Sequence, residues 1–235
     1  MRDWKHYWNH APKVRDPDPL KQVGKTVNGE PISRTQFEAL VADVWGGLAL
    51  ESSDLVLDLG CGNGLVTRAL AERCAAVVGV DFSEPLLASA RARAPANAEY
   101  LLADVCQLPV ELQRRRITKI LMYEALQHLD TQQASQVFEQ VRASPWDAPM
   151  FLGSIPDREQ LDLFYDTAER RADYEDRVKQ GTEDIGHWWT REALGALLEE
   201  HGLEVRFLRQ NPCLNGQHYR FDAVVTRCAT GRRLR

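Results

Sequence analysis

The most constraining feature of this sequence is a glycine-rich turn between an apolar strand and a helix. It reads Val56-Leu57-Asp58-Leu59-Gly60-Cys61-Gly62-Asn63-Gly64. Glycine is needed where the chain turns with positive φ, or where a ligand must approach the backbone without a Cβ in the way. The turn therefore predicts a ligand site at the end of a buried strand.

The spacing of the glycines separates this turn from two phosphate-binding loops. The dinucleotide fingerprint G-x-G-x-x-G, started at Gly60, needs a third glycine where this chain has Leu65. The P-loop needs Lys-Ser/Thr after its last glycine, but Gly64 is followed by Leu65-Val66. Neither loop fits well.

Apolar strands alternate with helices through the middle of the chain. The pattern predicts strands at 55–57, 76–80, 100–102, 117–122 and 150–152, with helices at 65–73, 85–94 and 131–141. Such alternation indicates right-handed βαβ units and a parallel sheet covered on both faces. After a helix capped by Thr190, strands at 205–208 and 221–226 are expected to form an antiparallel hairpin.

Two further acids follow later strands. Asp81 ends the second strand, 23 residues after Asp58, where a carboxylate accepts hydrogen bonds from ribose hydroxyls. Phe82 offers a ring face to a purine, and Asp104 follows the third strand. All three acids are expected to face the crevice in which open α/β sheets bind ligands.

These residues together resemble the class I S-adenosylmethionine-dependent methyltransferases. The family's motif of an acid followed by G-x-G-x-G is matched by Asp58, Gly60, Gly62 and Gly64, its ribose-binding acid by Asp81, and its adenine-side acid by Asp104 with Val105. The resemblance implies an α/β fold: a Rossmann-like seven-stranded sheet with an antiparallel last strand, helices on both faces and a helical lid insertion. It also implies S-adenosylmethionine as cofactor, S-adenosylhomocysteine as product, and no metal.

The expected cofactor contacts follow from the resemblance and from the glycine turn. They are Asp58, Gly60, Gly62, Asn63, Gly64, Asp81, Phe82, Ser83, Asp104, Val105, Tyr123 and Lys25. Lys25 is expected near the carboxylate of the cofactor's methionine part.

One methyltransferase domain is predicted over residues 1–235. It comprises an N-terminal cover and helix (1–50), an S-adenosylmethionine-binding core (52–153), a substrate lid insertion (154–189), and a closing helix and hairpin (190–228).

The chemistry of transfer suggests where a base is needed. In-line attack on a sulfonium methyl requires alignment and exclusion of water, and a hydroxyl nucleophile must also lose its proton. His128 and Glu124, after the fourth strand, are the predicted catalytic residues. The predicted substrate contacts are Tyr165, Arg170, His187, Trp188 and His218.

The predicted acceptor is a hydroxyl of a small molecule or a glycan. Short sequence patterns in the lid, at residues 21–26 and at residues 218–221 are similar to those of methyltransferases encoded with bacterial surface-polysaccharide genes. This resemblance implies a role in polysaccharide biosynthesis. The alternatives are N- or C-methylation of a small metabolite, an NAD-dependent oxidoreductase, and an inactive S-adenosylmethionine-binding module.

Composition argues against some classes of binding partner. A net charge of −5 argues against binding to nucleic acid. No apolar run is long enough for a membrane span, and five scattered cysteines without a secretory signal suit the cytoplasm. The oligomeric state stays open.

Overall fold

The computed structural model describes residues 2–228 and contains a seven-stranded sheet in the order β5-β4-β3-β6-β7-β9-β8. Five strands run parallel to one another: β3 (Leu55–Leu59), β4 (Ala76–Asp81), β5 (Ala98–Leu102), β6 (Lys119–Tyr123) and β7 (Met150–Pro156). The last strand, β9 (Arg220–Arg227), is antiparallel to both of its neighbours, β7 and β8 (Leu203–Arg209). The fold class predicted from the sequence is confirmed.

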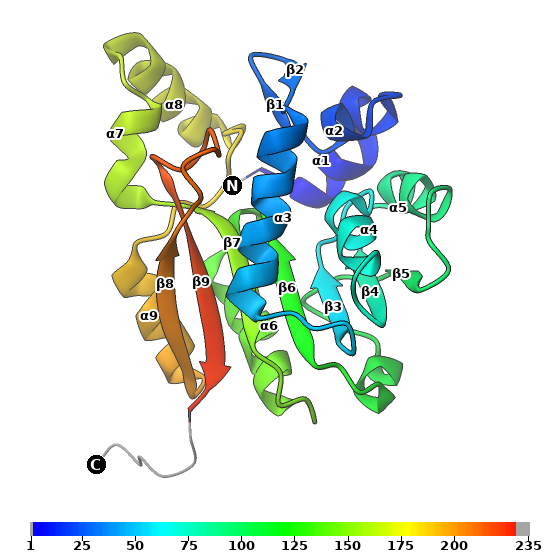
Figure 1. Ribbon diagram of the computed structural model, residues 1–235. Coiled ribbons are helices and arrows are strands. Elements are labelled where there is room, and N and C mark those ends of the chain that lie inside the picture. The colour runs from blue at the N-terminus through cyan, green and yellow to red at the C-terminus, as the bar shows by residue number, and fades with distance from the viewer. Residues whose placement is uncertain (1, 229–235) are drawn as a thin grey trace, which may run out of the picture.

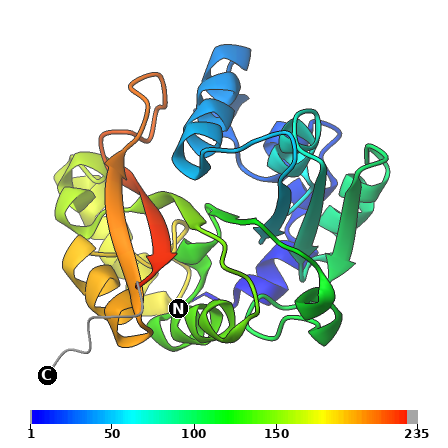
Figure 2. The same cartoon turned by 60° about the horizontal axis from the view of Figure 1, so that its bottom comes forward.

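Helices cover both faces of this sheet, as Figures 1 and 2 show. One face packs against α3 (Arg34–Leu48), α4 (Leu65–Ala71) and α5 (Glu84–Arg91), and the other against α6 (Thr131–Ala143) and α9 (Arg191–Glu200). The alternation of side chains along β3 explains the two cores: Val56 joins the α3–α4 cluster, whereas Leu57 and Leu59 join the α6–α9 cluster.

Local sequence signals set the ends of several helices. Ser33 before α3 and Asp130 before α6 each form a capping box with a glutamine three residues on. Thr190 accepts a hydrogen bond from the Ala193 amide and begins α9. Ser, Asp and Thr are residue types that mark the start of a helix in a sequence, and all three begin helices here.

Two additions lie above the carboxyl ends of the parallel strands (Figure 1). The first is an N-terminal segment of α1 (Trp4–His10), η1 (Pro12–Arg15), α2 (Pro19–Gln22) and the small hairpin of β1 (Thr26–Val27) and β2 (Glu30–Pro31). The second is an insertion of η4 (Arg158–Gln160), α7 (Leu161–Phe164) and α8 (Ala168–Gln180). The remaining short turns are η2 (Val110–Arg114) and η3 (Leu126–His128).

The insertion begins later than the sequence pattern suggested. Residues 154–156 still belong to β7, where Ile155 and Pro156 pair with Phe221 and Arg220 after an irregularity in register. Within residues 2–228, none of the helices is both long and apolar enough to cross a membrane.

Candidate functional site

A cavity of about 620 Å³ lies at the carboxyl ends of the parallel strands. Its wall is built from the glycine turn after β3, the ends of β4 and β6, the N-terminal segment and the start of β9. Twelve predicted site residues line it: Lys25, Asp58, Gly60, Gly62, Asn63, Asp81, Phe82, Asp104, Val105, Tyr123, Glu124 and His128.

The glycine turn has the geometry that its composition suggested. Gly60 has a φ of +75°, and a Cβ there would lie 2.5 Å from the Cβ of Ala125. Gly64 has a φ of +70°, and a Cβ there would lie 2.4 Å from the Tyr100 hydroxyl oxygen. Glycine therefore allows two close approaches in this turn: Gly60 lets the turn pack against Ala125 after β6, and Gly64, which does not line the cavity, lets the start of α4 pack against Tyr100 of β5.

Asp81 organises this turn from the end of β4. One carboxylate oxygen accepts the Gly62 amide at 2.8 Å, and the other accepts the Ser83 amide at 2.8 Å. Burial nevertheless raises the pKa of Asp81 to about 6. Each oxygen keeps one further acceptor site, so this carboxylate is able to accept a pair of vicinal hydroxyls.

Asp58 lies deeper and faces α4. Its carboxylate accepts a 2.6 Å hydrogen bond from the Thr67 hydroxyl, and burial raises its pKa to about 7. This contact ties β3 to α4 directly behind the glycine turn.

Asp104 is paired with the N-terminal segment. The Lys5 ammonium of α1 lies 2.5 Å from one carboxylate oxygen, and the Cys106 amide donates to the other at 2.9 Å. Although burial acts in the opposite sense, the Lys5 contact holds the pKa of Asp104 below its ordinary value.

A buried ion pair lies at the end of β6. The Lys25 ammonium is 2.7 Å from the Glu124 carboxylate and 4.4 Å from the centre of the Tyr123 ring. Burial lowers the pKa of Lys25; it would raise that of Glu124, but the nearby Lys25 and Arg220 cations lower the Glu124 pKa instead. The lowered pKa of Glu124 keeps its carboxylate charged near neutral pH.

The backbone beside this pair is strained. Glu124 and Ser154 both have positive φ, +53° and +60°, although neither is glycine. Their side chains meet at 3.1 Å, Ser154 donating to Glu124. Such conformations cost about 1–3 kcal/mol each and tend to occur at functional sites.

His128 lies under the aromatic residues of α1. Its ring centre is 4.2 Å from that of Trp4 and 5.6 Å from that of Trp8. Burial, together with the cations Lys13, Arg220 and Arg2, lowers the pKa of His128 to about 3, with Glu124 opposing. Its buried Nδ1 has no hydrogen-bond partner among the described residues.

The N-terminal segment is anchored by two residues expected to bind the cofactor. Asn63 donates to the Pro19 carbonyl and to the Gln22 side chain, each at 2.8 Å. The Ser83 hydroxyl donates to the Trp8 carbonyl at 2.6 Å, and Ser83 does not line the cavity. The Asn63 amide nitrogen and the Ser83 hydroxyl thus hold the N-terminal segment against the core.

The predicted substrate contacts do not line the cavity. Tyr165 and Trp188 pack in a hydrophobic cluster with Leu161 and Ile185. Arg170 pairs with Asp166, the His187 ring lies tilted against that of Trp189, and His218 is exposed. These five side chains pack within the insertion or lie on its surface and on the loop before β9.

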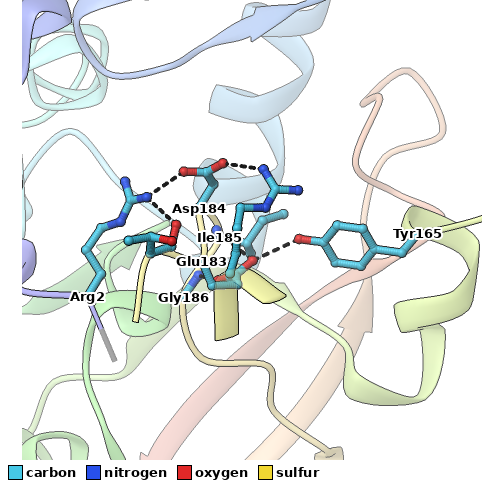
Figure 3. A network of polar contacts seen from close by, with 8 residues as sticks. Arg2, Tyr165, Glu183, Asp184, Ile185 and Gly186 are labelled. Atoms are coloured by element: carbon cyan, nitrogen blue, oxygen red, sulfur yellow. Dashed lines mark hydrogen bonds and ion pairs between the residues drawn. The ribbon is translucent and has the colours of Figure 1, made fainter. Parts of the chain in front are cut away.

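The insertion meets the cavity at Asp184 and Ile185, which Figure 3 shows with the residues that hold them. Arg2 donates to Asp184 at 2.8 Å and to the Thr182 carbonyl, so the N-terminal segment is joined to the insertion. The Tyr165 hydroxyl donates to Glu183 at 2.9 Å, and Glu183 also accepts the Ile185 and Gly186 amides.

Sequence reasoning missed several cavity residues. They are Arg2, Trp4, Lys5, Tyr7, Trp8, Lys13, Gln127, Tyr219 and Arg220. The unusual aromatic content of residues 4–8 was the one local signal that this segment packs on something. For Arg220, the sequence carries no comparable signal.

Comparisons with known proteins agree with this geometry. Residues 56–144 match a family model described as a methyltransferase domain. The chain is 30% identical over 156 residues to the ubiquinone biosynthesis O-methyltransferase of Pseudomonas aeruginosa, which covers 64% of this chain and 65% of that protein. The Coxiella burnetii protein of the same name is 42% identical over 77 residues, 32% of each chain. The matched stretches thus span less than two thirds of these relatives.

Solved structures share the fold at low sequence identity. The magnesium protoporphyrin IX methyltransferase of Synechocystis with bound S-adenosylhomocysteine has a TM-score of 0.64 and 17% identity, covering 95% of this chain and 98% of that one. An S-adenosylmethionine-dependent methyltransferase from Clostridium acetobutylicum has a TM-score of 0.60 and 14% identity, covering 84% and 93%. The match to a methyltransferase domain favours a methyltransferase over the nicotinamide-dependent alternative. Residues 56–144 are thus similar to a methyltransferase domain, and the chain shares the fold of methyltransferases of known structure.

Proposed function

We propose that this protein transfers the methyl group of S-adenosylmethionine to a hydroxyl of a small molecule. The observation that carries the proposal is one cavity that joins an acidic, glycine-lined half to a half lined by aromatic residues, His128 and cations. A cavity of about 620 Å³ lies within the usual range for small-molecule sites, roughly 300–1,000 Å³.

The acidic half fits the cofactor. Asp81 has acceptor capacity for the ribose hydroxyls, Phe82 offers a ring to the adenine, and Asp104 offers a carboxylate to the adenine amino group. The absence of a Cβ at Gly60 and Gly62 leaves the backbone open to close approach by a ligand. When bound, the cofactor supplies an electrophilic methyl on a positively charged sulfur.

The role proposed for the Lys25–Glu124 pair is to set the charge beside the reacting atoms. Glu124 is held ionised by Lys25 and Arg220, and it stabilises positive charge at this end of the cavity. Lys25 is the proposed partner for the carboxylate of the cofactor's methionine part.

His128 is the proposed acceptor of the hydroxyl proton. Because its pKa is lowered to about 3, the ring is neutral at physiological pH and has a nitrogen ready to accept. Among hydroxyls, a phenol or an enol suits so weak a base best, because the uphill cost of proton transfer to His128 falls as the pKa of the hydroxyl falls. Trp4 and Trp8 beside His128 suit an aromatic acceptor.

Two further considerations favour oxygen as the methylated atom. The curated relatives from Pseudomonas and Coxiella are named O-methyltransferases. A hydroxyl also makes use of a proton acceptor at His128. The glycan acceptor and the cytoplasmic location stay predictions.

The test has two stages. Calorimetric titration with S-adenosylhomocysteine and with NADH measures whether the cavity binds the methyltransferase product and not a dinucleotide. Transfer of labelled methyl into fractionated small molecules then measures turnover. Binding without transfer to any fraction would support an inactive binding module instead.

A further inference from the structure

Lys13, Lys25 and Arg220 are three cations that line the cavity. Among residues 2–228, none of the three forms an ion pair with Asp58, Asp81 or Asp104. Glu124 is the acid beside them, and its carboxylate is engaged by Lys25 at 2.7 Å. The other lining acids belong to the cofactor half, cap a helix, or pair with Arg2.

Arg220 has a fixed position but no anionic partner. Its Nη1 donates to the Gln127 side-chain oxygen at 2.6 Å and to the Ser154 carbonyl at 2.5 Å, both uncharged acceptors. Among residues 2–228 no carboxylate forms an ion pair with it. Asp222, two residues on, does not line the cavity and accepts the Ser154 amide and the Gln210 side chain.

Lys13 is the second cation without a carboxylate. Its ammonium lies 4.3 Å from the centre of the Trp8 ring and 5.1 Å from that of Tyr7. Within the described part of the chain, these rings are its recorded partners. Both cations lie near the proposed reaction centre: Lys13 contacts Trp8, whose ring centre is 5.6 Å from that of His128, and Arg220 donates to Gln127, the residue before His128.

We infer that the methyl acceptor carries a carboxylate, and that Arg220, with the charge of Lys13 nearby, binds it. This inference rests on the proposed function, because it describes the acceptor of that reaction. The Arg220 guanidinium donates to two neutral oxygens, and a carboxylate of the acceptor would give it a charge-assisted, bidentate partner. Binding one end of the acceptor at β9 orients the hydroxyl at the other end toward His128.

The experiment uses pairs of probes in which a neutral group replaces the carboxylate. Wild-type protein saturated with S-adenosylhomocysteine is titrated with 3,4-dihydroxybenzoate and with its neutral amide, and with glucuronate and glucose. The two pairs distinguish an aromatic acid from a sugar acid. At least one acid is expected to bind about ten-fold more tightly than its neutral partner.

Two variants assign this preference to Arg220. Arg220→Gln removes the cation. Gln127→Glu keeps the guanidinium and supplies a carboxylate next to Nη1, so it competes with the ligand. Both should reduce the acid preference to about two-fold or less. Arg206→Gln, which removes an exposed arginine of β8, is the matched control and should leave it unchanged.

The outcomes separate this inference from the proposed function. If S-adenosylhomocysteine binds but neither acid binds more tightly than its neutral partner, the carboxylate site is overturned and methyl transfer still stands. An acid preference that survives in a folded Gln127→Glu protein also overturns the assignment to Arg220. If S-adenosylhomocysteine itself fails to bind to wild type, the proposed function falls first.

Discussion

The Lys5 ammonium lies 2.5 Å from the Asp104 carboxylate, so the first helix contacts an acid that follows the third strand of the core. The sequence predicts that Asp104 accepts from adenine, and the same side chain also tethers the N-terminal segment. Arg2, three residues earlier, pairs with Asp184 of the insertion at 2.8 Å. Together these ion pairs close the cavity from above.

Removal of both ion pairs should loosen the contacts that hold the N-terminal segment over the cavity. We expect the double variant with Arg2→Ala and Lys5→Ala to release S-adenosylhomocysteine about two- to five-fold faster, because partly exposed ion pairs contribute little individually. Stopped-flow dissociation measures this rate, and limited proteolysis should cut after Lys13 or Arg15 sooner. Lys179→Ala, which removes an exposed pair on α8, is the control. Unchanged dissociation and cleavage would show that the ion pairs do not hold the cover.

Asp81→Ala should weaken S-adenosylhomocysteine binding by about 1.5–3 kcal/mol, because a charged acceptor for the ribose hydroxyls is lost. Calorimetry measures the change. Asp81 also accepts the Gly62 and Ser83 amides, so circular dichroism must first show that the variant is folded. Asp147→Ala, an exposed acid elsewhere, serves as the comparison. Equal affinity in a folded Asp81 variant would remove the ribose assignment.

His128→Ala should lower turnover with little change in affinity for S-adenosylhomocysteine, and by less than the roughly 10²- to 10⁴-fold usual for a general base, because the His128 pKa of about 3 lies far below the working pH. The pH profile adds an independent check. With a pKa of about 3, His128 is already neutral above pH 5, so turnover should show no inflection from this group between pH 5 and 8. An inflection near 6.5 that disappears in the variant would contradict the burial of this ring.

Asp222→Asn should stabilise the protein at high pH. Burial raises the folded-state pKa of Asp222 from 3.8 to about 6, so the folded chain binds a proton more tightly than the unfolded chain. Ionisation therefore costs stability as pH rises from about 4 to 6, and above that the cost is constant. Asparagine keeps an Oδ1 to accept both hydrogen bonds, which meet at that one atom.

The expected gain is about 1–3 kcal/mol of unfolding free energy at pH 8, since one pKa unit corresponds to about 1.4 kcal/mol. Wild type and variant should converge near pH 4. Urea unfolding at both pH values measures the difference. A gain of equal size at pH 4 would indicate a cause other than ionisation.

Much of the fold was predictable because it depends on local patterns. The strand at 55–59, the turn at Gly60–Gly64 and the helix that follows are consecutive in the chain. Their residue types alone favour a strand, a turn with positive φ and a helix. The capping box at Ser33 and the cap at Thr190 are equally local. The antiparallel last strand was predicted through the resemblance to a family.

The residues of the candidate site were predictable from the sequence only where they directly follow a strand of the sheet. Tyr165 and Trp188 were expected to meet a substrate, but each is an apolar ring that a nearby cluster buries. Residue type alone did not distinguish packing from binding there. Asn63 and Ser83 lie beside the glycine turn as expected, yet their side chains hold the N-terminal segment.

The sequence by itself determined the crevice: an apolar strand, alternating glycines and acids at successive strand ends produce it from short-range preferences. Only the tertiary structure decided what covers and charges that crevice. Lys5 meets Asp104, and Arg220 meets Gln127 and Ser154, across separations of 66 to 99 residues in the printed sequence. Such contacts form because sheet order and helix packing bring distant segments together, and no local pattern records which distant side chain will satisfy a buried charge.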